Sequence, residues 1–208
     1  MQNDTFNAKV IKLDTNVILS IIDIEEITPA LEDFINKEFV SICEGNSGSN
    51  LDMVKSEILI FLNRQDKNTK MGASAEFFIH LYLKYNNFKQ ECLFRNLEEG
   101  SIKKGFDGYY SRNNEQWIME SKSGSIKTND ISHKKKVKEA YTGLKSLIEG
   151  HSTNNPWKNA YNHAQHRDIN TKESIVKSIK NISDLYISKK YMNIRDLNIL
   201  PCSTENFD

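Results

Sequence analysis

Apolar residues recur along this chain in two periods, one typical of strands and one typical of helices. Alternation predicts a strand near the start, and apolar positions three and four apart then predict a helix with Thr28 as its N-cap and Pro29 in its first turn. In order, the predicted elements are a strand at 8–13, a helix at 28–39, a strand at 39–43 and a loop at 44–50.

The middle of the chain predicts a helix followed by three strands. Residues 51–65 are apolar without a decisive period, but residues 70–85 carry the regular stripe Ala75, Phe78, Leu81, Tyr82 and Tyr85 of a half-buried helix. The turn-rich pieces that follow separate three runs with β character, and such short spacings favour antiparallel hairpins. These predicted strands are 90–97, 104–110 and 115–122, and the Ser123–Gly124–Ser125 piece after them reads as a turn.

The last third is more helical. Asp130 is a plausible N-cap for a helix that ends at Gly150, and Asn155 with Pro156 marks the start of another within 154–167. Asn170 and Glu173 stand in capping-box positions before a third helix, and residues 196–202 could form a last strand. The order of elements predicts an α/β fold in which residues 1–50 elaborate a main domain at 51–208.

Composition describes a globular chain with uneven charge. Of the 208 residues, 38% are hydrophobic and 27% charged, and no apolar run approaches the length of a membrane span. With no basic, apolar leader at the N-terminus, we expect a cytoplasmic protein without a membrane partner. The net charge is zero, but residues 1–100 hold 10 Lys and Arg against 16 Asp and Glu, while residues 101–208 hold 18 against 12. The basic second half suits a polyanion, although a solvated helix face gives the same count.

Three cysteines without a CxxC spacing argue against a disulfide framework or a zinc site.

The chemistry that stands out is at the end of the third predicted strand. Alternation places Ile118, Glu120 and Lys122 on one face, where a structural strand in a core avoids charge. A solvated strand end would explain an isolated Glu-x-Lys equally well.

Asp107 in the preceding strand favours a functional interpretation. It lies between Gly105 and Gly108, and hairpin pairing of the two strands would bring its carboxylate towards Glu120. Like charges converge where a cation compensates them, and two hard oxygen ligands fit Mg²⁺ or Mn²⁺ better than zinc. Lys122 would reach the same centre.

Four residues carry a resemblance to a known superfamily. Glu76 on the helix, Asp107 on the second strand, and Glu120 with Lys122 on the third resemble the PD-(D/E)xK nuclease superfamily in order and placement. One departure is that Phe106, instead of proline, precedes Asp107. The resemblance implies a restriction-endonuclease-like αβββαβ core, with a mixed sheet flanked by helices, an N-terminal α/β elaboration and extra C-terminal helices.

The same resemblance implies a role for each of the four residues. Asp107, Glu120 and Glu76 would hold Mg²⁺ or Mn²⁺, and Lys122 would serve the attacking water and the phosphate. For Glu76 the assignment comes from the family pattern only, because His80 one turn on is more typical of a satisfied core histidine than of a ligand.

More narrowly, ASAEFFIHLYL, CLFRN, KKGFDGYY and WIMESKSG resemble the HamA-like nuclease family of the Hachiman antiviral defence system. That likeness implies a DNA-degrading effector with a helicase partner and no small-molecule cofactor. The best candidates for phosphate contacts, or alternatively a solvated face, are Lys127, Lys134, Lys135, Lys136 and Lys138. The alternative function is a non-catalytic nucleic-acid-binding or assembly module with the same fold.

Overall fold

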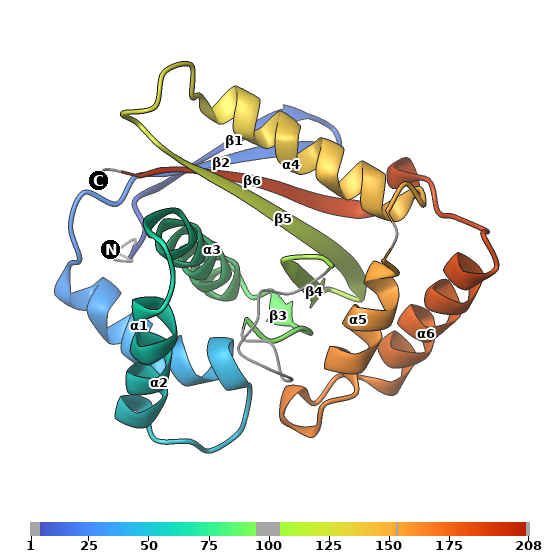
Figure 1. Cartoon of the computed structure of the whole chain (residues 1–208), viewed down its shortest axis with the longest axis horizontal. Coiled ribbons are helices and arrows are strands. Elements are labelled where there is room, and N and C mark those ends of the chain that lie inside the picture. Colours follow the sequence, from blue (N-terminus) through green and yellow to red (C-terminus); the bar gives the residue numbers. More distant parts are fainter. Residues whose placement is uncertain (1–4, 95–104, 153, 207–208) are drawn as a thin grey trace. The chain divides into compact units, whose positions relative to one another are not determined.

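The computed structural model describes residues 5–94, 105–152 and 154–206 (Figure 1). The chain divides into two compact units, residues 1–39 and residues 40–208. Among the described residues, no helix has both the length and the hydropathy that crossing a bilayer requires. The α/β class predicted from the sequence is confirmed, and the second unit contains a mixed sheet flanked by helices.

The first unit contains an antiparallel hairpin of β1 (Ala8–Asp14) and β2 (Val17–Ile22), followed by the start of α1 (Pro29–Glu44). The N-cap at Thr28 is confirmed, because its Oγ1 accepts a hydrogen bond from the Leu31 backbone at 3.2 Å. The strand predicted at 39–43 is wrong, since α1 continues through it to Glu44. A five-residue apolar run does not distinguish a strand from a buried helical turn.

The second unit holds the four-stranded sheet β3-β4-β5-β6. The predicted antiparallel hairpin is confirmed for β4 (Gly108–Arg112) and β5 (Glu115–Ser125), which pair from Gly108 with Met119 to Arg112 with Glu115. The predicted last strand is confirmed as β6 (Asn198–Asn206), which runs parallel to β5. β3 is only Lys89–Gln90. Of the strand predicted at 90–97, residues 91–94 are not strand, and residues 95–97 lie outside the described residues.

Helices precede and follow the strands. Residues 51–65, undecided from the sequence, are helical over most of their length, and the helices predicted around Ala75, Leu144, Trp157 and Ile179 are all present. Their bounds are α2 (Leu51–Asn63), α3 (Lys67–Tyr85), α4 (His133–Ile148), α5 (Pro156–Ala164) and α6 (Glu173–Ile187), with short 3-10 turns η1 (Arg167–Ile169) and η2 (Ile194–Asp196).

Of the three later helices α4, α5 and α6, capping was predicted correctly at one. Asn155 caps α5, because its Oδ1 accepts from the backbone of Trp157 at 3.1 Å. Asp130 does not cap α4: it has a left-handed backbone with φ of 66°, and Ser132 accepts from Lys135 N instead. Asn170 also has a left-handed backbone, with φ of 53°, and α6 begins after Lys172 without a side-chain cap. Asx residues serve left-handed turns as readily as caps, so composition alone does not separate the two roles.

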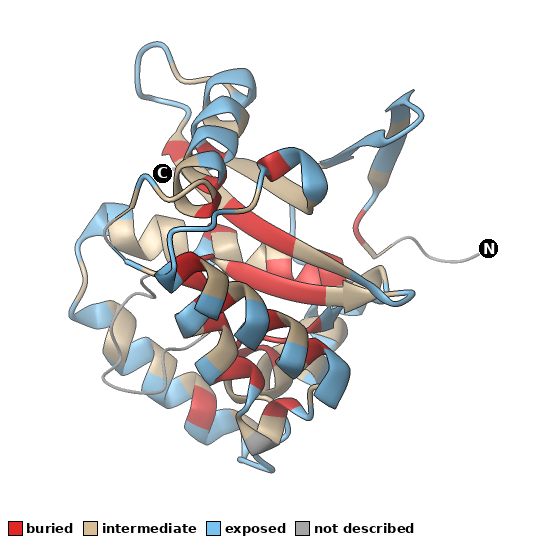
Figure 2. Ribbon diagram, turned by 90° about the vertical axis from the view of Figure 1, so that its right-hand side faces the viewer, coloured by how far each residue is buried: buried red, intermediate tan, exposed pale blue. Residues whose placement is uncertain are grey.

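The two faces of the sheet pack against different helices (Figures 1 and 2). On one face, Ile118 belongs to a cluster with Leu144 of α4 and Trp157 of α5. On the other, Met119 packs with Leu83 of α3 and with Tyr110. Alternating side chains of β5 therefore point into two cores, and the central strands are buried on both sides.

The close packing around Gly108 predicts a large difference between two Gly→Ala changes. A β-carbon at Gly108 would lie 2.5 Å from the Tyr110 ring and 3.1 Å from Met119 Cε, and both side chains are fully buried. We expect Gly108→Ala to lower the free energy of unfolding by about 1–3 kcal/mol. At Gly143 in α4 the nearest atom is Glu120 Oε1 at 3.5 Å, so Gly143→Ala should be neutral or stabilising by up to about 1 kcal/mol. Urea unfolding of both variants tests the pair, and equal losses would contradict it.

Candidate functional site

β5 carries the centre of the candidate site. It continues to Ser125, so the turn predicted at residues 123–125 is wrong, because these residues pair with Thr204 through Asn206 of β6. Glu120 and Lys122 lie on the β5 face that α4 covers, where a β-carbon on Gly143 would stand 3.5 Å from Glu120 Oε1. The charged pair therefore lies against α4 and not at a fraying strand end.

Glu120 and Lys122 form a close ion pair. Lys122 Nζ donates to Glu120 Oε1 at 2.5 Å, and the side chain of Glu120 is 10% exposed against 38% for that of Lys122. The second oxygen of Glu120, Oε2, is buried and accepts no hydrogen bond from the described residues. A buried carboxylate oxygen without a donor is costly, and it is the kind of atom that a bound cation would satisfy.

Asp107 comes to the same place from the preceding strand. Because Gly108 pairs with Met119 across antiparallel strands, Asp107, immediately before β4 begins, is at the level of Glu120. Its Oδ2 accepts from the Ser121 backbone N–H at 2.7 Å and from the Ser121 hydroxyl at 3.2 Å. These two bonds fix the Asp107 carboxylate against β5, as the hairpin prediction requires.

The electrostatics reflect two carboxylates in a confined space. Burial, and then the negative charge of Asp107, raise the pKa of Glu120 to about 7. Burial of Lys122 disfavours its charged form, but the hydrogen bond and charge of Glu120, with that of Asp107, outweigh it and raise the pKa of Lys122. Lys122 is therefore cationic at neutral pH, while Glu120 is poised between its two protonation states.

Glu76 lies on α3, the helix on the other face of the sheet. Its Oε1 is 3.3 Å from His80 Nε2, and the other ring nitrogen, Nδ1, is hydrogen-bonded to the Tyr110 hydroxyl. Burial raises the pKa of Tyr110 well above its ordinary value, so the phenol is neutral and can donate to His80. The core-histidine interpretation of His80 therefore fits its complete burial, and the negative charge of Glu76 contributes to raising the pKa of Glu120.

The Tyr110 hydroxyl gives a testable contribution to stability. Tyr110→Phe removes the hydroxyl bound to the buried His80, and we expect the free energy of unfolding to fall by about 1–2 kcal/mol. The matched control is Tyr109→Phe on the opposite face of β4, whose hydroxyl donates to the half-buried Gln116 at 2.6 Å. Because Gln116 can turn to water, that loss should be smaller. Denaturant unfolding measures both, and a larger loss at Tyr109 would contradict the prediction.

The donor set fits a divalent cation at two carboxylates. Asp107 and Glu120 supply hard oxygen atoms on adjacent strands, and the unsatisfied Oε2 of Glu120 is one of them. Within residues 5–94, 105–152 and 154–206, no group of three or more His, Cys, Asp or Glu side chains is close enough to hold a metal. The structure thus brings together Asp107, Glu120 and Lys122, and leaves Glu76 outside that set.

The predicted phosphate-contact lysines lie between β5 and the first turns of α4. Lys127, Lys134, Lys135 and Lys138 are exposed, whereas Lys136 is half-buried beside β5, with its Cε 3.3 Å from where a β-carbon of Gly124 would stand. Lys136 pairs with Glu139 at 2.8 Å and Lys135 with Asp130 at 3.6 Å. The charges of Lys135 and Lys136 are therefore partly neutralised by neighbouring acids.

Three further polar residues near Lys122 were not identified from the sequence. Glu139 of α4 adds to the negative field that raises the pKa of Lys122. On β6, Ser203 is the register partner of Lys122, and its hydroxyl lies 2.8 Å from His133 Nδ1. Glu205, two residues on, is 3.8 Å from His133 Nε2 and has a buried Oε1 without a hydrogen bond from the described residues. The parallel pairing of β5 and β6 brings Ser203 and Glu205 to this place, and the packing of α4 brings Glu139, so no local signal could have found them.

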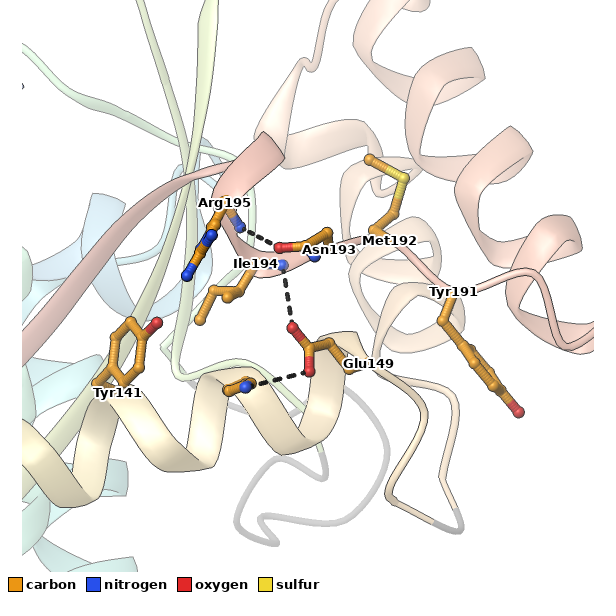
Figure 3. Close-up of a pocket in the computed structure, with 8 residues that line it drawn as sticks. Tyr141, Glu149, Tyr191, Met192, Asn193, Ile194 and Arg195 are labelled. Atoms are coloured by element: carbon orange, nitrogen blue, oxygen red, sulfur yellow. Dashed lines mark hydrogen bonds and ion pairs between the residues drawn. The ribbon is translucent and has the colours of Figure 1, made fainter.

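A pocket of about 340 Å³ lies elsewhere, between the C-terminal half of α4 and η2 (Figure 3). Its polar groups bind one another: Glu149 pairs with Lys145 at 3.6 Å and accepts from the Ile194 backbone at 3.5 Å. None of the predicted site residues lines it. The candidate site, at the β4–β5 hairpin, is therefore separate from this pocket.

Comparisons of the chain with protein-family models, with curated proteins and with solved structures find no match.

Proposed function

We propose that this protein is a metal-dependent nuclease that hydrolyses DNA phosphodiester bonds, with a restriction-endonuclease-like core. The observation that supports it most is the convergence of Asp107, Glu120 and Lys122 at one point of the β4–β5 hairpin. A fold without a function at this point has little reason to place the half-buried Asp107 beside the buried Glu120, because the arrangement disfavours the charge of Glu120. The element order from α3 through β3, β4 and β5 to α4 and β6 is compatible with this core.

Asp107 and Glu120 would hold Mg²⁺ or Mn²⁺, and Glu76, which α3 places outside that pair, would act on the centre through its negative charge. The bound cation would supply Lewis-acid polarisation of the phosphate and a water of lowered pKa. Lys122 keeps its proton at neutral pH because its pKa is raised, so its role would be to stabilise negative charge on the phosphate and not to act as a base. Asp107 is oriented for its task by the two donors of Ser121.

The DNA would approach along the lysines after β5. Lys127, Lys134 and Lys138 are exposed, and Lys135 and Lys136 can exchange their acidic partners for phosphates. Action as an antiviral effector with a helicase subunit is the biological setting that the resemblance to the HamA-like family implies. It adds a partner whose absence could leave the enzyme inactive in isolation.

The test is cleavage of supercoiled plasmid and single-stranded DNA by the purified chain in Mg²⁺, Mn²⁺ or EDTA. We expect cutting that EDTA abolishes. The rival function, a nucleic-acid-binding module, predicts a mobility shift of the same DNA without cutting in either metal. Neither cutting nor binding, with the presumed helicase subunit present or absent, would overturn the nuclease proposal.

A further inference from the structure

The pocket between α4 and η2 contains polar groups that the fold leaves without partners. Arg195 is exposed, and its guanidinium makes no ion pair with the described residues. Asn193 Oδ1 accepts from the Arg195 backbone at 2.9 Å, while the Asn193 side-chain nitrogen donates to none of the residues that the structure describes. The acid of the pocket, Glu149, is engaged by Lys145 and by the Ile194 backbone. The groups left over are hydrogen-bond donors, so they suit an anion or a ligand rich in acceptors.

Two aromatic rings stand at opposite ends of this pocket (Figure 3). Tyr141 of α4 is 39% exposed, and Figure 3 shows the Arg195 side chain extending towards it. Tyr191, 43% exposed, packs edge to face on Tyr186 with ring centroids 5.0 Å apart. Gly150 makes room for the Tyr191 ring, because a β-carbon there would lie 2.4 Å from it. A half-exposed aromatic face and an unpaired cation thus line the same pocket.

The charge around the pocket is positive. The segment KKYMNIRD over residues 189–196 holds three cations against one acid, and its two lysines are exposed. Among the residues that line the pocket, Lys145 and Glu149 neutralise each other, which leaves the charge of Arg195. The local electric field therefore attracts an anion and not a cation.

We propose that this pocket binds one nucleotide of a single-stranded nucleic acid, with the base stacked on Tyr141 and its phosphate held by Arg195. Stacking on an aromatic ring needs no particular base, and a guanidinium binds phosphate through two N–H groups at once. Asn193 can donate to an acceptor on the base or the sugar. The volume of about 340 Å³ falls in the lower part of the range of ligand pockets, about 300–1,000 Å³.

The exposure of the two rings favours a strand over a free nucleotide. A small-molecule pocket encloses about 70–90% of its ligand, whereas Tyr141 and Tyr191 keep 39% and 43% of their own surface exposed. A strand gains further affinity from neighbouring phosphates, for which the exposed lysines of residues 189–196 are available. In a duplex the bases stack on one another and are not free for a protein ring. Because this binding needs neither a metal nor Lys122, it is independent of the nuclease proposal.

The test follows the backbone and arginine side-chain NMR signals of the full chain, in EDTA, as a thymidine tetranucleotide is added. We expect the signals of Tyr141, Asn193 and Arg195 to shift and to saturate. Tyr141→Ala and Arg195→Ala should each weaken this binding at least about fivefold, whereas Tyr141→Phe, which keeps the ring, should stay within about twofold. The matched control Arg64→Ala removes an exposed arginine at the end of α2 and should also stay within about twofold.

Three further ligands identify the occupant. Thymidine 5′-monophosphate should shift the same signals but bind at least about tenfold more weakly than the tetranucleotide, and inorganic phosphate more weakly still. A 12-base-pair duplex should leave the Tyr141 signals in place. Equal binding of the monophosphate would show a free-nucleotide site, and equal binding of phosphate an anion site without base stacking; either result contradicts the proposal. Shifts confined to residues 127–138 would overturn it too, while leaving the nuclease proposal intact.

Discussion

Lys122→Ala should abolish DNA cleavage while leaving DNA binding within about threefold of the wild type. In the structure the ammonium is 2.5 Å from Glu120 and cationic at neutral pH, so its removal takes away a charge that would stabilise the phosphate during the reaction. Losing one such electrostatic partner reduces turnover by about 100-fold or more. Plasmid cleavage under single-turnover conditions measures the rate, and fluorescence anisotropy with a labelled duplex measures binding.

The control for this substitution is Lys177→Ala on α6. The side chain of Lys177 is 74% exposed and pairs with Glu173 one turn away, far in sequence from the candidate site. The change removes the same charge from the chain, so it corrects for a general loss of attraction to DNA. If Lys122→Ala and Lys177→Ala cleave equally well, Lys122 has no part in the chemistry and the site assignment fails.

The metal-free protein should become less stable as the pH rises from 4.5 towards 7. The folded state raises the pKa of Glu120 to about 7 from an ordinary value of 4.5, so between these values the folded chain holds a proton that the unfolded chain has released. Stability therefore falls with rising pH across this window, by on the order of 3 kcal/mol for this one group. Above pH 7 the loss is complete.

Glu120→Gln isolates that contribution. The amide has the shape of the acid but does not titrate, so the variant should lack this part of the pH dependence and be more stable than the wild type at pH 8. Urea unfolding of both proteins in EDTA gives the change in the free energy of unfolding between pH 5 and pH 8 for each. The difference between the two changes is the contribution of Glu120. Mg²⁺ or Mn²⁺ at pH 8 should stabilise the wild type and not the variant, because a cation replaces the missing proton. Parallel pH profiles for the two proteins would show that Glu120 is not the titrating group.

The sequence predicts the parts of this fold that depend on local order. The helix around Ala75, the hairpin around Asp107 and Glu120, and the cap at Asn155 all follow from periodicity and from residue types at element ends. The errors occur where two structures satisfy the same local pattern. Residues 39–43 fit a helical turn as well as a strand, and Asp130 fits a left-handed turn as well as an N-cap.

The remaining misses depend on partners far along the chain. Ser123 to Ser125 resemble a turn locally, yet Thr204 through Asn206 of β6 draw them into a strand. That same pairing places Ser203 beside Lys122, which no spacing rule indicates. For the candidate site, the adjacency of Asp107 and Glu120 was predictable from hairpin pairing, whereas the His80 and Tyr110 contacts of Glu76 required the packing of α3 on the sheet.

The register of β5 has a consequence for the order of biosynthesis. β4 pairs with β5 as far as Met119, and among the described residues the half of β5 that carries Glu120 and Lys122 gains its ladder from β6, beginning at Pro201. Because a ribosome delivers β5 about 80 residues before β6, this non-local pairing must wait, and non-local pairing is slow. In the nascent chain, the β4–β5 hairpin would then form first, while the part of β5 that carries Glu120 and Lys122 still lacks its β6 partner. The candidate site would therefore be complete only after β6 has been translated.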